Sequence, residues 1–354
     1  MQDSPSHLRD RMRTLIWPLT LPYRLILWLR HWLYDHGIFR SVKPSVPTIV
    51  VGNLALGGTG KTPHVELILR ELQDRMPIAT LSRGYGRKSK GHREVLTEDH
   101  PSITGDEPLQ LKRKFPAVRV FVNADRIAGI EKIKSTIQGV RAIVLDDAFQ
   151  HRQMQGDLNI LLTTYQRPWH RDLLIPAGRL RDLPAQRKRA QIVIVTKCPS
   201  LPSDHDREQW RKDLGLVGEQ ELFFSGIEYD PIEDLSSKDI LLVTGIADPQ
   251  PLVDHLRSRA RKLEHLAYPD HHDFTPGDLQ QIAGRFGKFA PGPKMLVTTG
   301  KDAVRLRPLM KNGPLSGVPL QVIGMRAIIL DRPRHFGELI QAYVGKDKAD
   351  RATA

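Results

Sequence analysis

Short apolar runs alternate with helix-length amphipathic stretches along most of the chain after residue 44. The runs that look most like strands lie at 48–51, 78–81, 118–122, 142–145, 158–162 and 192–195. They are apolar throughout and rich in β-branched residues, which is typical of strands covered on both faces. The stretches between them, such as 64–72 and 126–137, have helical spacing. This alternation predicts an α/β fold with a doubly wound, mostly parallel sheet.

A second set of the same kind begins near Ile240. Its expected strands lie at 241–244, 295–298 and 320–323, and its expected helices at 250–258 and 276–286. A polar stretch with a proline and two serines, at 226–238, separates the two sets and is typical of a linker. We therefore expect an N-terminal region over 1–45, a core over 46–230 and a second, smaller α/β lobe over 231–354.

The N-terminal region contains an apolar stretch, 15–34, with three tryptophans. It is interrupted by Pro18, Pro22, Arg24 and Arg30. A spanning helix needs about 20 mostly apolar residues and tolerates charge poorly near its middle, so a transmembrane helix is not expected. Tryptophans flanked by arginines instead favour an amphipathic helix that docks at a membrane interface. The alternative, an amphipathic helix that packs on the protein's own core, remains open.

The composition and charge of the chain limit the kinds of partner that it is expected to bind. The chain has 354 residues, of which 40% are hydrophobic and 26% charged, as in ordinary globular proteins. Its formal charge of +13 favours anionic partners such as phosphates, nucleic acid or an anionic membrane surface. No phrase typical of a nucleic-acid-binding module is visible, so we expect no nucleic acid partner. Cys198 is the single cysteine, which excludes an internal disulfide and a cysteine zinc cluster.

A glycine-rich loop follows the first expected strand. Residues 52–63 read GNLALGGTGKTP and lead into a helical pattern, which is the order that a P-loop requires. In such loops backbone N–H groups surround the phosphates, a lysine meets their charge and a hydroxyl holds Mg²⁺. The strict pattern has glycine where this chain has Ala55, and a simple glycine turn is the alternative. The residues expected to bind phosphate are Ala55, Leu56, Gly57, Gly58, Thr59, Gly60, Lys61 and Thr62.

Two acids end the strand expected at 142–145. Asp146 and Asp147 follow its last apolar residue. Ligands bind at the carboxyl edge of open α/β sheets, and an aspartate there holds Mg²⁺ in P-loop proteins. These two residues are therefore candidate magnesium ligands together with Thr62, although a solvated pair that caps the next segment would have the same sequence. This identifies 46–230 as a candidate P-loop nucleotide-binding core.

The sequence also bears on whether the nucleotide is GTP or ATP. Proteins that read guanine place Asn/Thr-Lys-x-Asp after a late strand, and here the corresponding phrase ends in Cys198-Pro199. The carboxylate that would accept hydrogen bonds from guanine is absent, so ATP is the expected nucleotide.

Several further motifs follow in a fixed order. They are WLYD at 32–35, LSRGYGR at 81–87, GDEP at 105–108, NADR at 123–126, FQHR at 149–152, PAGRLRD at 176–182, YPDHHDF at 268–274 and TTGKDAV at 298–304. Together with the P-loop they resemble the tetraacyldisaccharide 4′-kinase (LpxK) family of lipid A biosynthesis over most of the chain. The resemblance implies ATP-dependent phosphorylation of the 4′-hydroxyl of an acylated glucosamine disaccharide 1-phosphate, giving lipid IVA. It also implies a peripheral location on the cytoplasmic face of the inner membrane.

The resemblance also assigns roles to residues. Asp106 would be the base at the acceptor hydroxyl and His271 its partner, with Lys61 stabilising the transferred group; Glu107 joins the candidate magnesium ligands. The alternative for Asp106 is a helix cap, and His272 competes with His271 for the role of partner. Arg83 and Arg126 follow expected strands, which makes them candidates for substrate phosphates, because guanidinium groups match phosphate geometry.

Two positions depart from the family pattern. The usual glutamate of the Thr-Glu-Lys-Asp phrase is Gly300, which leaves the role of that loop open, and the usual glutamate after Leu-Arg is Asp182. A membrane-associated P-loop ATPase or switch protein without a lipid acceptor is the alternative function, and its ATP hydrolysis would not depend on added disaccharide.

Overall fold

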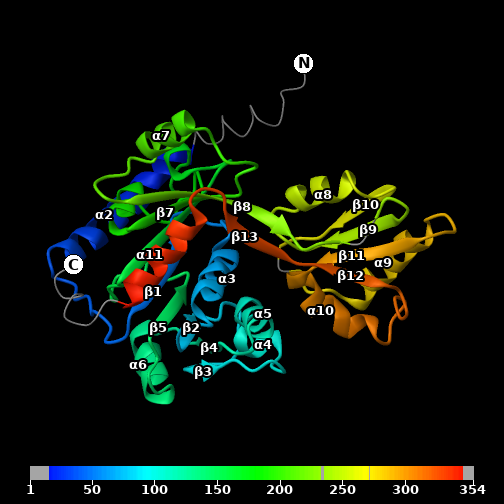
Figure 1. Cartoon of the computed structure of the whole chain (residues 1–354), viewed down its shortest axis with the longest axis horizontal. Helices are drawn as coiled ribbons and strands as arrows, with labels where there is room; N and C mark the ends of the chain where they lie inside the picture. The colour runs from blue at the N-terminus through cyan, green and yellow to red at the C-terminus, as the bar shows by residue number, and fades with distance from the viewer. Residues whose placement is uncertain (1–15, 233–234, 271, 346–354) are drawn as a thin grey trace. The chain divides into compact units, whose positions relative to one another are not determined.

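Two compact units make up the chain. The computed structural model describes residues 16–232, 235–270 and 272–345. The first unit comprises residues 1–227 and 327–354, and the second comprises 228–326. Figure 1 shows the elements of both units along the chain.

The first unit is built on a nine-stranded sheet whose strand order is β13-β8-β7-β6-β1-β5-β2-β4-β3. Its strands are β1 (Thr48–Asn53), β2 (Ile78–Ser82), β3 (Arg93–Glu94), β4 (Arg119–Val122), β5 (Ala142–Asp146), β6 (Leu158–Thr164), β7 (Ile192–Thr196), β8 (Glu221–Tyr229) and β13 (Met325–Ile329). The pairs from β4 through β2, β5, β1, β6 and β7 to β8 are parallel, and β3 is antiparallel to β4. The expected mostly parallel sheet is confirmed.

Helices follow most of these strands. They are α3 (Lys61–Leu72), α4 (Pro101–Thr104), α5 (Asp106–Lys114), α6 (Arg126–Thr136), α7 (Asp204–Asp213) and α11 (Pro333–Gly345), with short 3₁₀ turns η2 (Trp169–Arg171) and η3 (Pro184–Arg189). Every residue of β1, β5, β6 and β7 is buried. This explains why those strands read as continuous apolar runs. Figure 1 shows α11 beside α3, and a Cβ added to Gly337 of α11 would lie 2.8 Å from Oε2 of Glu71.

The second unit contains a smaller parallel sheet with the order β10-β9-β11-β12. Its strands are β9 (Asp239–Thr244), β10 (Lys262–Ala267), β11 (Lys294–Thr299) and β12 (Leu320–Ile323), and its helices are α8 (Gln250–Arg257), α9 (Pro276–Gly287) and α10 (Gly300–Met310). Two apolar clusters form its core, one with Leu241 and Val243 and one with Ile240 and Leu242. Alternate residues of β9 therefore point to opposite faces, and both faces are covered.

The predicted lobe boundary at the C-terminal end differs from this division. Residues 327–354 belong to the first unit, because β13 pairs with β8 at the edge of the large sheet. After β13, the N–H of Leu330 donates to the carbonyl oxygen of Phe224 at 2.8 Å. The chain thus returns to its first sheet after completing the smaller one.

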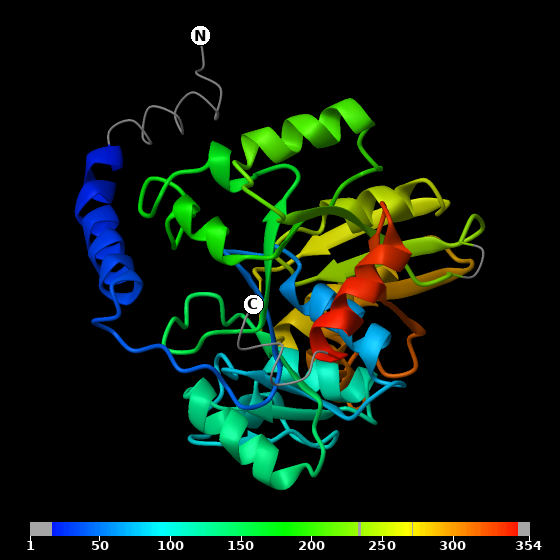
Figure 2. The same ribbon diagram turned by 60° about the vertical axis from the view of Figure 1, so that its left-hand side comes forward.

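The N-terminal segment forms η1 (Trp17–Leu19) and the helix α2 (Thr20–Asp35). Thr20, Leu27 and His31 are buried on one side of the helix. The other side exposes large apolar residues, among them Leu21, Leu25, Ile26, Trp28, Leu29 and Trp32. Among the helices described, none is long and apolar enough to cross a membrane. Figure 2 shows α2 at the edge of the first unit, beside the loops that follow β6.

Candidate active site

The candidate residues gather where the parallel strands of the first unit end. Val51 of β1 is in register with Asp146 of β5, and Asn53 with Leu162 of β6. The loops after β1, β2, β4, β5 and β6 therefore leave the same edge of the sheet, where ligands bind in open α/β folds. The P-loop, the Asp146–Asp147 pair and the arginine loops are brought together by this topology.

The P-loop joins β1 to α3 and has the geometry of a phosphate cradle. Gly57 and Gly60 have φ values of 98° and 88°, a region that disfavours residues with a side chain. Ala55 is absent from the positive-φ residues of the described chain, so alanine is tolerated at the position where the strict pattern has glycine. Helix α3 begins at Lys61, and Thr62 lies in its first turn. Backbone N–H groups at this helix end favour anions.

Buried polar bonds hold the loop from beneath. Asn53 Nδ2 donates to Thr59 Oγ1 at 2.7 Å, and Thr196 Oγ1 donates to the Thr59 carbonyl at 2.9 Å. His64 Nδ1 lies 2.7 Å from the Gly60 carbonyl oxygen, and its Nε2 lies 2.8 Å from Ser225 Oγ. Burial lowers the pKa of His64 to about 4, so the ring is neutral near pH 7. Because a carbonyl only accepts, the proton of the neutral ring lies on Nδ1.

Asp146 supplies a buried carboxylate with an open coordination position. The residue is 8% exposed, and its Oδ1 has no hydrogen-bond partner among the described residues. Burial, with the nearby charge of Glu107, raises the pKa of Asp146 to about 7. A buried carboxylate oxygen without a donor is costly unless a cation binds it, so this residue fits Mg²⁺.

Few side chains of the described residues are available to hold a magnesium ion. No group of three or more His, Cys, Asp or Glu within the described residues is arranged to hold a metal alone. Mg²⁺ usually takes one or two protein ligands and completes its shell with water and substrate phosphates. Asp146 and the hydroxyl of Thr62, beside the P-loop, match that pattern.

Asp147 is engaged with cations. Its backbone is left-handed, with φ of 51°, and its carboxylate accepts hydrogen bonds from both terminal nitrogens of Arg181. Lys61 Nζ lies 3.8 Å from Asp147 Oδ2. Burial alone would raise the pKa of Asp147, but the bonds from Arg181 and the charge of Lys61 outweigh it and lower the pKa. The carboxylate of Asp147, one of the candidate magnesium ligands, therefore binds Arg181 and lies near Lys61.

The two predicted arginines differ in exposure. Arg126 is 4% exposed and donates from Nη1 to the carbonyl oxygens of Asn123 at 2.8 Å and Ala124 at 3.0 Å. Burial lowers the pKa of Arg126, and the charge of nearby Arg83 adds to this effect. Arg83 is exposed in the loop after β2. The two guanidinium groups therefore lie near each other, and the charges of Asp146 and Asp147 also act on Arg126.

Asp106 is not the N-cap of its helix. Gly105, with φ of 94°, holds the N-cap position, and Asp106 and Glu107 form the first turn of α5. The carboxylate of Asp106 is half-buried. His271 lies outside the described residues. Its neighbour His272 lies 3.0 Å from Asp278 Oδ2 and stacks on the ring of Tyr268.

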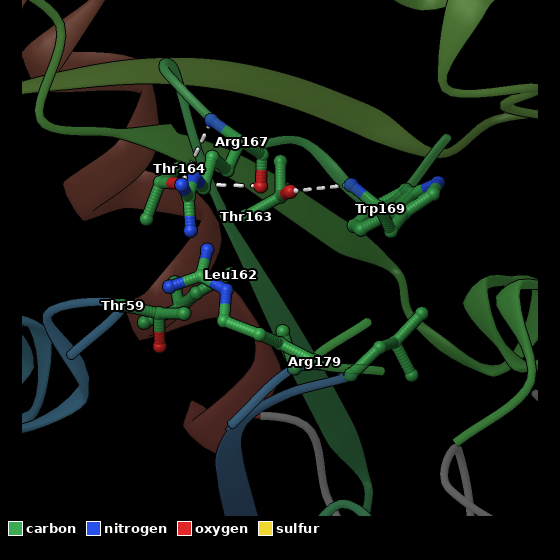
Figure 3. Close-up of a pocket in the computed structure, with 9 residues that line it drawn as sticks. Thr59, Leu162, Thr163, Thr164, Arg167, Trp169 and Arg179 are labelled. Carbon is green, nitrogen blue, oxygen red and sulfur yellow. Dashed lines mark hydrogen bonds between the residues drawn. The ribbon is translucent and has the colours of Figure 1, made fainter. Parts of the chain in front are cut away.

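A small cavity borders the P-loop on the side of β6. It is lined by Leu54, Ala55, Thr59, Leu162, Thr163, Thr164, Arg167, Trp169 and Arg179. Figure 3 shows Arg179 and Arg167 at this cavity, with Trp169 to one side. The N–H of Leu56 donates to the Arg179 carbonyl oxygen at 2.7 Å. The loop containing the PAGRLRD motif thus supports the P-loop directly.

Arg181 is not one of the two arginines chosen from the sequence, Arg83 and Arg126, yet it contacts Asp147 beside the P-loop. Besides its bonds to Asp147, its Nη2 donates to Asn53 Oδ1 at 2.6 Å. Gln150 also contacts Asn53, because its Nε2 donates to the Asn53 carbonyl oxygen at 2.8 Å. Both belong to motifs that the sequence displays, but the pairing of strands far apart in the chain determines that they meet at Asn53.

Comparisons with known proteins point in one direction. The family model described as tetraacyldisaccharide-1-P 4′-kinase matches residues 12–344. A tetraacyldisaccharide 4′-kinase from Phocaeicola vulgatus is 40% identical over 352 residues, covering 94% of this chain and 95% of that protein. One from Bacteroides fragilis is 44% identical over 309 residues, covering 82% of each. A crystal structure of LpxK from Aquifex aeolicus in complex with ATP superposes with a TM-score of 0.71 at 26% identity, covering 94% of this chain and 99% of that one.

Proposed function

The chain belongs to the tetraacyldisaccharide-1-phosphate 4′-kinase family, and we propose that it acts through the residues at the carboxyl edge of the first unit's sheet. Its activity is the ATP-dependent phosphorylation of the 4′-hydroxyl of tetraacyldisaccharide 1-phosphate, a step of lipid A biosynthesis that gives lipid IVA. The observation that best supports the site is the P-loop at the start of α3 beside Asp146, whose Oδ1 has no protein partner in the described chain.

The donor half of the site binds the phosphates of ATP. Among residues 55–62, the N–H groups of Leu56 and Thr59 donate to carbonyl oxygens of the protein. The other N–H groups of this loop and the ammonium of Lys61 would surround the β- and γ-phosphates. Asp146 and Thr62 would hold Mg²⁺, and Glu107, whose charge acts on Asp146, would support it. When bound, Mg²⁺ neutralises charge on the β- and γ-phosphate oxygens. Arg83 and Arg126 meet the anionic oxygens of the substrates near the transferred group.

The acceptor half orients the 4′-hydroxyl. Asp106 accepts the hydroxyl proton as the new oxygen–phosphorus bond forms, and ADP leaves with the electrons of the broken bond. Its place at the start of α5, beside Glu107, supports this role. His271 is proposed as the partner of Asp106 on the family resemblance alone.

The exposed side of α2 is proposed to dock on the membrane that contains the substrate. Leu25, Trp28 and Trp32 offer apolar area on one side of a helix that also has arginines. An acylated substrate and the net charge of +13 favour an anionic leaflet, here the cytoplasmic face of the inner membrane. The protein is then peripheral, with α2 lying in the interface.

Analysis of the product tests the function. Purified protein, ATP and Mg²⁺ are incubated with tetraacyldisaccharide 1-phosphate in detergent micelles, and the lipid is examined by mass spectrometry and ³¹P NMR. We expect one added phosphate, present as a monoester at the 4′ position, and no product with Lys61→Ala. An unmodified lipid alongside normal ATP binding would contradict the proposal.

A further inference from the structure

A buried polar contact joins helix α2 to the loop that contains Arg181 and Asp182. His31, which is 3% exposed, lies with Nε2 at 2.6 Å from Oδ1 of Asp182, which is fully buried. Arg152 Nη1 lies 3.1 Å from His31 Nδ1. A guanidinium only donates, so Nδ1 accepts and the ring proton is on Nε2, where it is donated to Asp182. The tautomer of His31 is thereby fixed by its two neighbours.

A second contact from the same helix reaches the adjacent residue. The hydroxyl of Tyr23 donates to the carbonyl oxygen of Arg181 at 2.8 Å. Tyr23 and His31 are eight residues apart, slightly more than two helical turns, and so lie on the same side of α2. Together they hold the consecutive residues Arg181 and Asp182 against the helix. Asp182, the acid of the Leu-Arg-Asp phrase, is therefore held by His31, which lies outside the phosphate site.

The side chain of Arg181 extends from this anchored backbone into the site. It bonds to Asp147, whose carboxylate also lies near Lys61, and to Asn53, which in turn bonds to Thr59 of the P-loop. A continuous path of short contacts thus runs from α2 through Arg181 to the residues that surround the phosphates. Any tilt of α2 shifts the backbone from which the Arg181 guanidinium extends.

We propose that His31 and Tyr23 are positioning residues for phosphoryl transfer, which makes α2 part of the catalytic apparatus as well as a membrane contact. The inference rests on the proposed function, because it takes Arg181 to act beside the donor phosphates. The side of α2 with Tyr23 and His31 fixes Arg181, and its exposed side, with Trp28, is taken to face the lipid. The two sides consequently affect different kinetic constants.

Variants of the two sides separate these roles. His31→Ala removes the donor to Asp182, His31→Gln restores a donor at the position of Nε2, and Tyr23→Phe removes only the hydroxyl. Trp28→Ala is the matched control on the exposed side, where the residue is 53% exposed. The kcat and both KM values are measured in mixed micelles, and binding is measured by co-sedimentation with vesicles of phosphatidylethanolamine and phosphatidylglycerol.

We expect His31→Ala to lower kcat about 10- to 100-fold, because misplaced catalytic groups cost rate steeply. Vesicle binding and the lipid KM should stay within twofold of wild type, and His31→Gln should recover most of the loss. Tyr23→Phe should lower kcat several-fold, whereas Trp28→Ala should raise the lipid KM and weaken sedimentation at unchanged kcat. If His31→Ala fails to fold by circular dichroism, Tyr23→Phe decides.

The inference would be overturned if Tyr23→Phe, or a folded His31→Ala, had the kcat of the wild type. It would also be overturned if His31→Ala changed only vesicle binding and the lipid KM. The proposed function is tested separately by whether the wild-type protein phosphorylates the lipid at all. If the wild type transfers phosphate and these variants have the same kcat, only the positioning role is contradicted.

Discussion

Asp106 lies one residue inside α5, with the N-cap position taken by Gly105. A residue at this position is not required to cap the helix, so its replacement should affect chemistry more than folding. We expect Asp106→Asn to lower turnover about 10²- to 10⁴-fold, the range for loss of a general base, and to leave the ATP dissociation constant within about twofold. Single-turnover transfer and nucleotide titration measure the two quantities.

Asp254→Asn is the matched control for this variant, because it removes an exposed carboxylate in the second unit. Near wild-type transfer by a folded Asp106→Asn would exclude this residue as the base.

His64 makes stability depend on pH. Its pKa is about 4 in the folded protein, mainly through burial, and about 6.5 in an unfolded chain. The unfolded state binds the proton first, so the free energy of unfolding is fully retained above pH 6.5 and falls as the pH drops toward 4. Between pH 7.5 and pH 5 the contribution of this residue is about 2 kcal/mol.

Urea unfolding of the wild type and of His64→Gln at both pH values measures the effect of His64. The wild type should lose about 2 kcal/mol more than the variant between pH 7.5 and pH 5. Equal losses in the two proteins would show that His64 is protonated in the folded state or does not contribute.

Cys198 should be inert in the folded protein. It is 5% exposed, and burial raises the pKa of its thiol to about 12. The thiolate is the reactive form, so alkylation by iodoacetamide at pH 8 should be at least tenfold slower in buffer than in guanidinium chloride. Mass spectrometry of the intact protein measures this, and equal rates would mean that the loop after β7 opens readily.

At the scale of elements, the exposed side of α2 should determine membrane affinity. Burying a large aliphatic or aromatic side chain contributes roughly 1.5–3 kcal/mol, so the double variant Leu25→Ser/Trp28→Ser should weaken vesicle binding by at least about 100-fold. Leu201→Ser is the matched control, because Leu201 is an exposed leucine outside α2, at 43% exposure. Equal sedimentation of the two variants would contradict the docking role.

Strand patterns predicted the elements that have strong local signals. The central strands β1, β5, β6 and β7 are buried on both faces and were visible as apolar runs. The edge strand β13 and the helix α11 were not predicted, although α11 buries Phe336, Ile340 and Val344 at helical spacing. Their place in the first unit depends on pairing with β8, a contact between residues about a hundred positions apart, which no local pattern reveals.

In the candidate site, too, only the residues with a local sequence signal could be predicted. The P-loop and the Asp146–Asp147 pair could be predicted because one segment of sequence contains all that their chemistry needs. Arg181 could not be chosen from among the many arginines, because its role follows from its contacts with Asn53, 128 residues away, and with Asp147, 34 residues away. The same holds for the contact of His31 with Asp182.

For the whole molecule, the relatives cover both units. The Phocaeicola vulgatus kinase aligns over 94% of the chain, and the Aquifex aeolicus structure over the same share. The return of the chain to its first sheet through β13 makes the second unit an insertion between two strands of the large sheet. The kinase activity is therefore assigned to the whole chain rather than to the P-loop unit alone.

The partition of labelled phosphate from γ-labelled ATP tests most directly whether the P-loop serves a lipid kinase. Wild-type protein is supplied with increasing tetraacyldisaccharide 1-phosphate in micelles, and label is counted in lipid and in free phosphate, with Lys61→Ala as the control. A lipid kinase predicts that label enters the lipid in proportion to ATP consumed, and that both need the lipid and Lys61. Label that appears only as free phosphate, at a rate independent of lipid, would contradict this and favour a P-loop ATPase or switch protein.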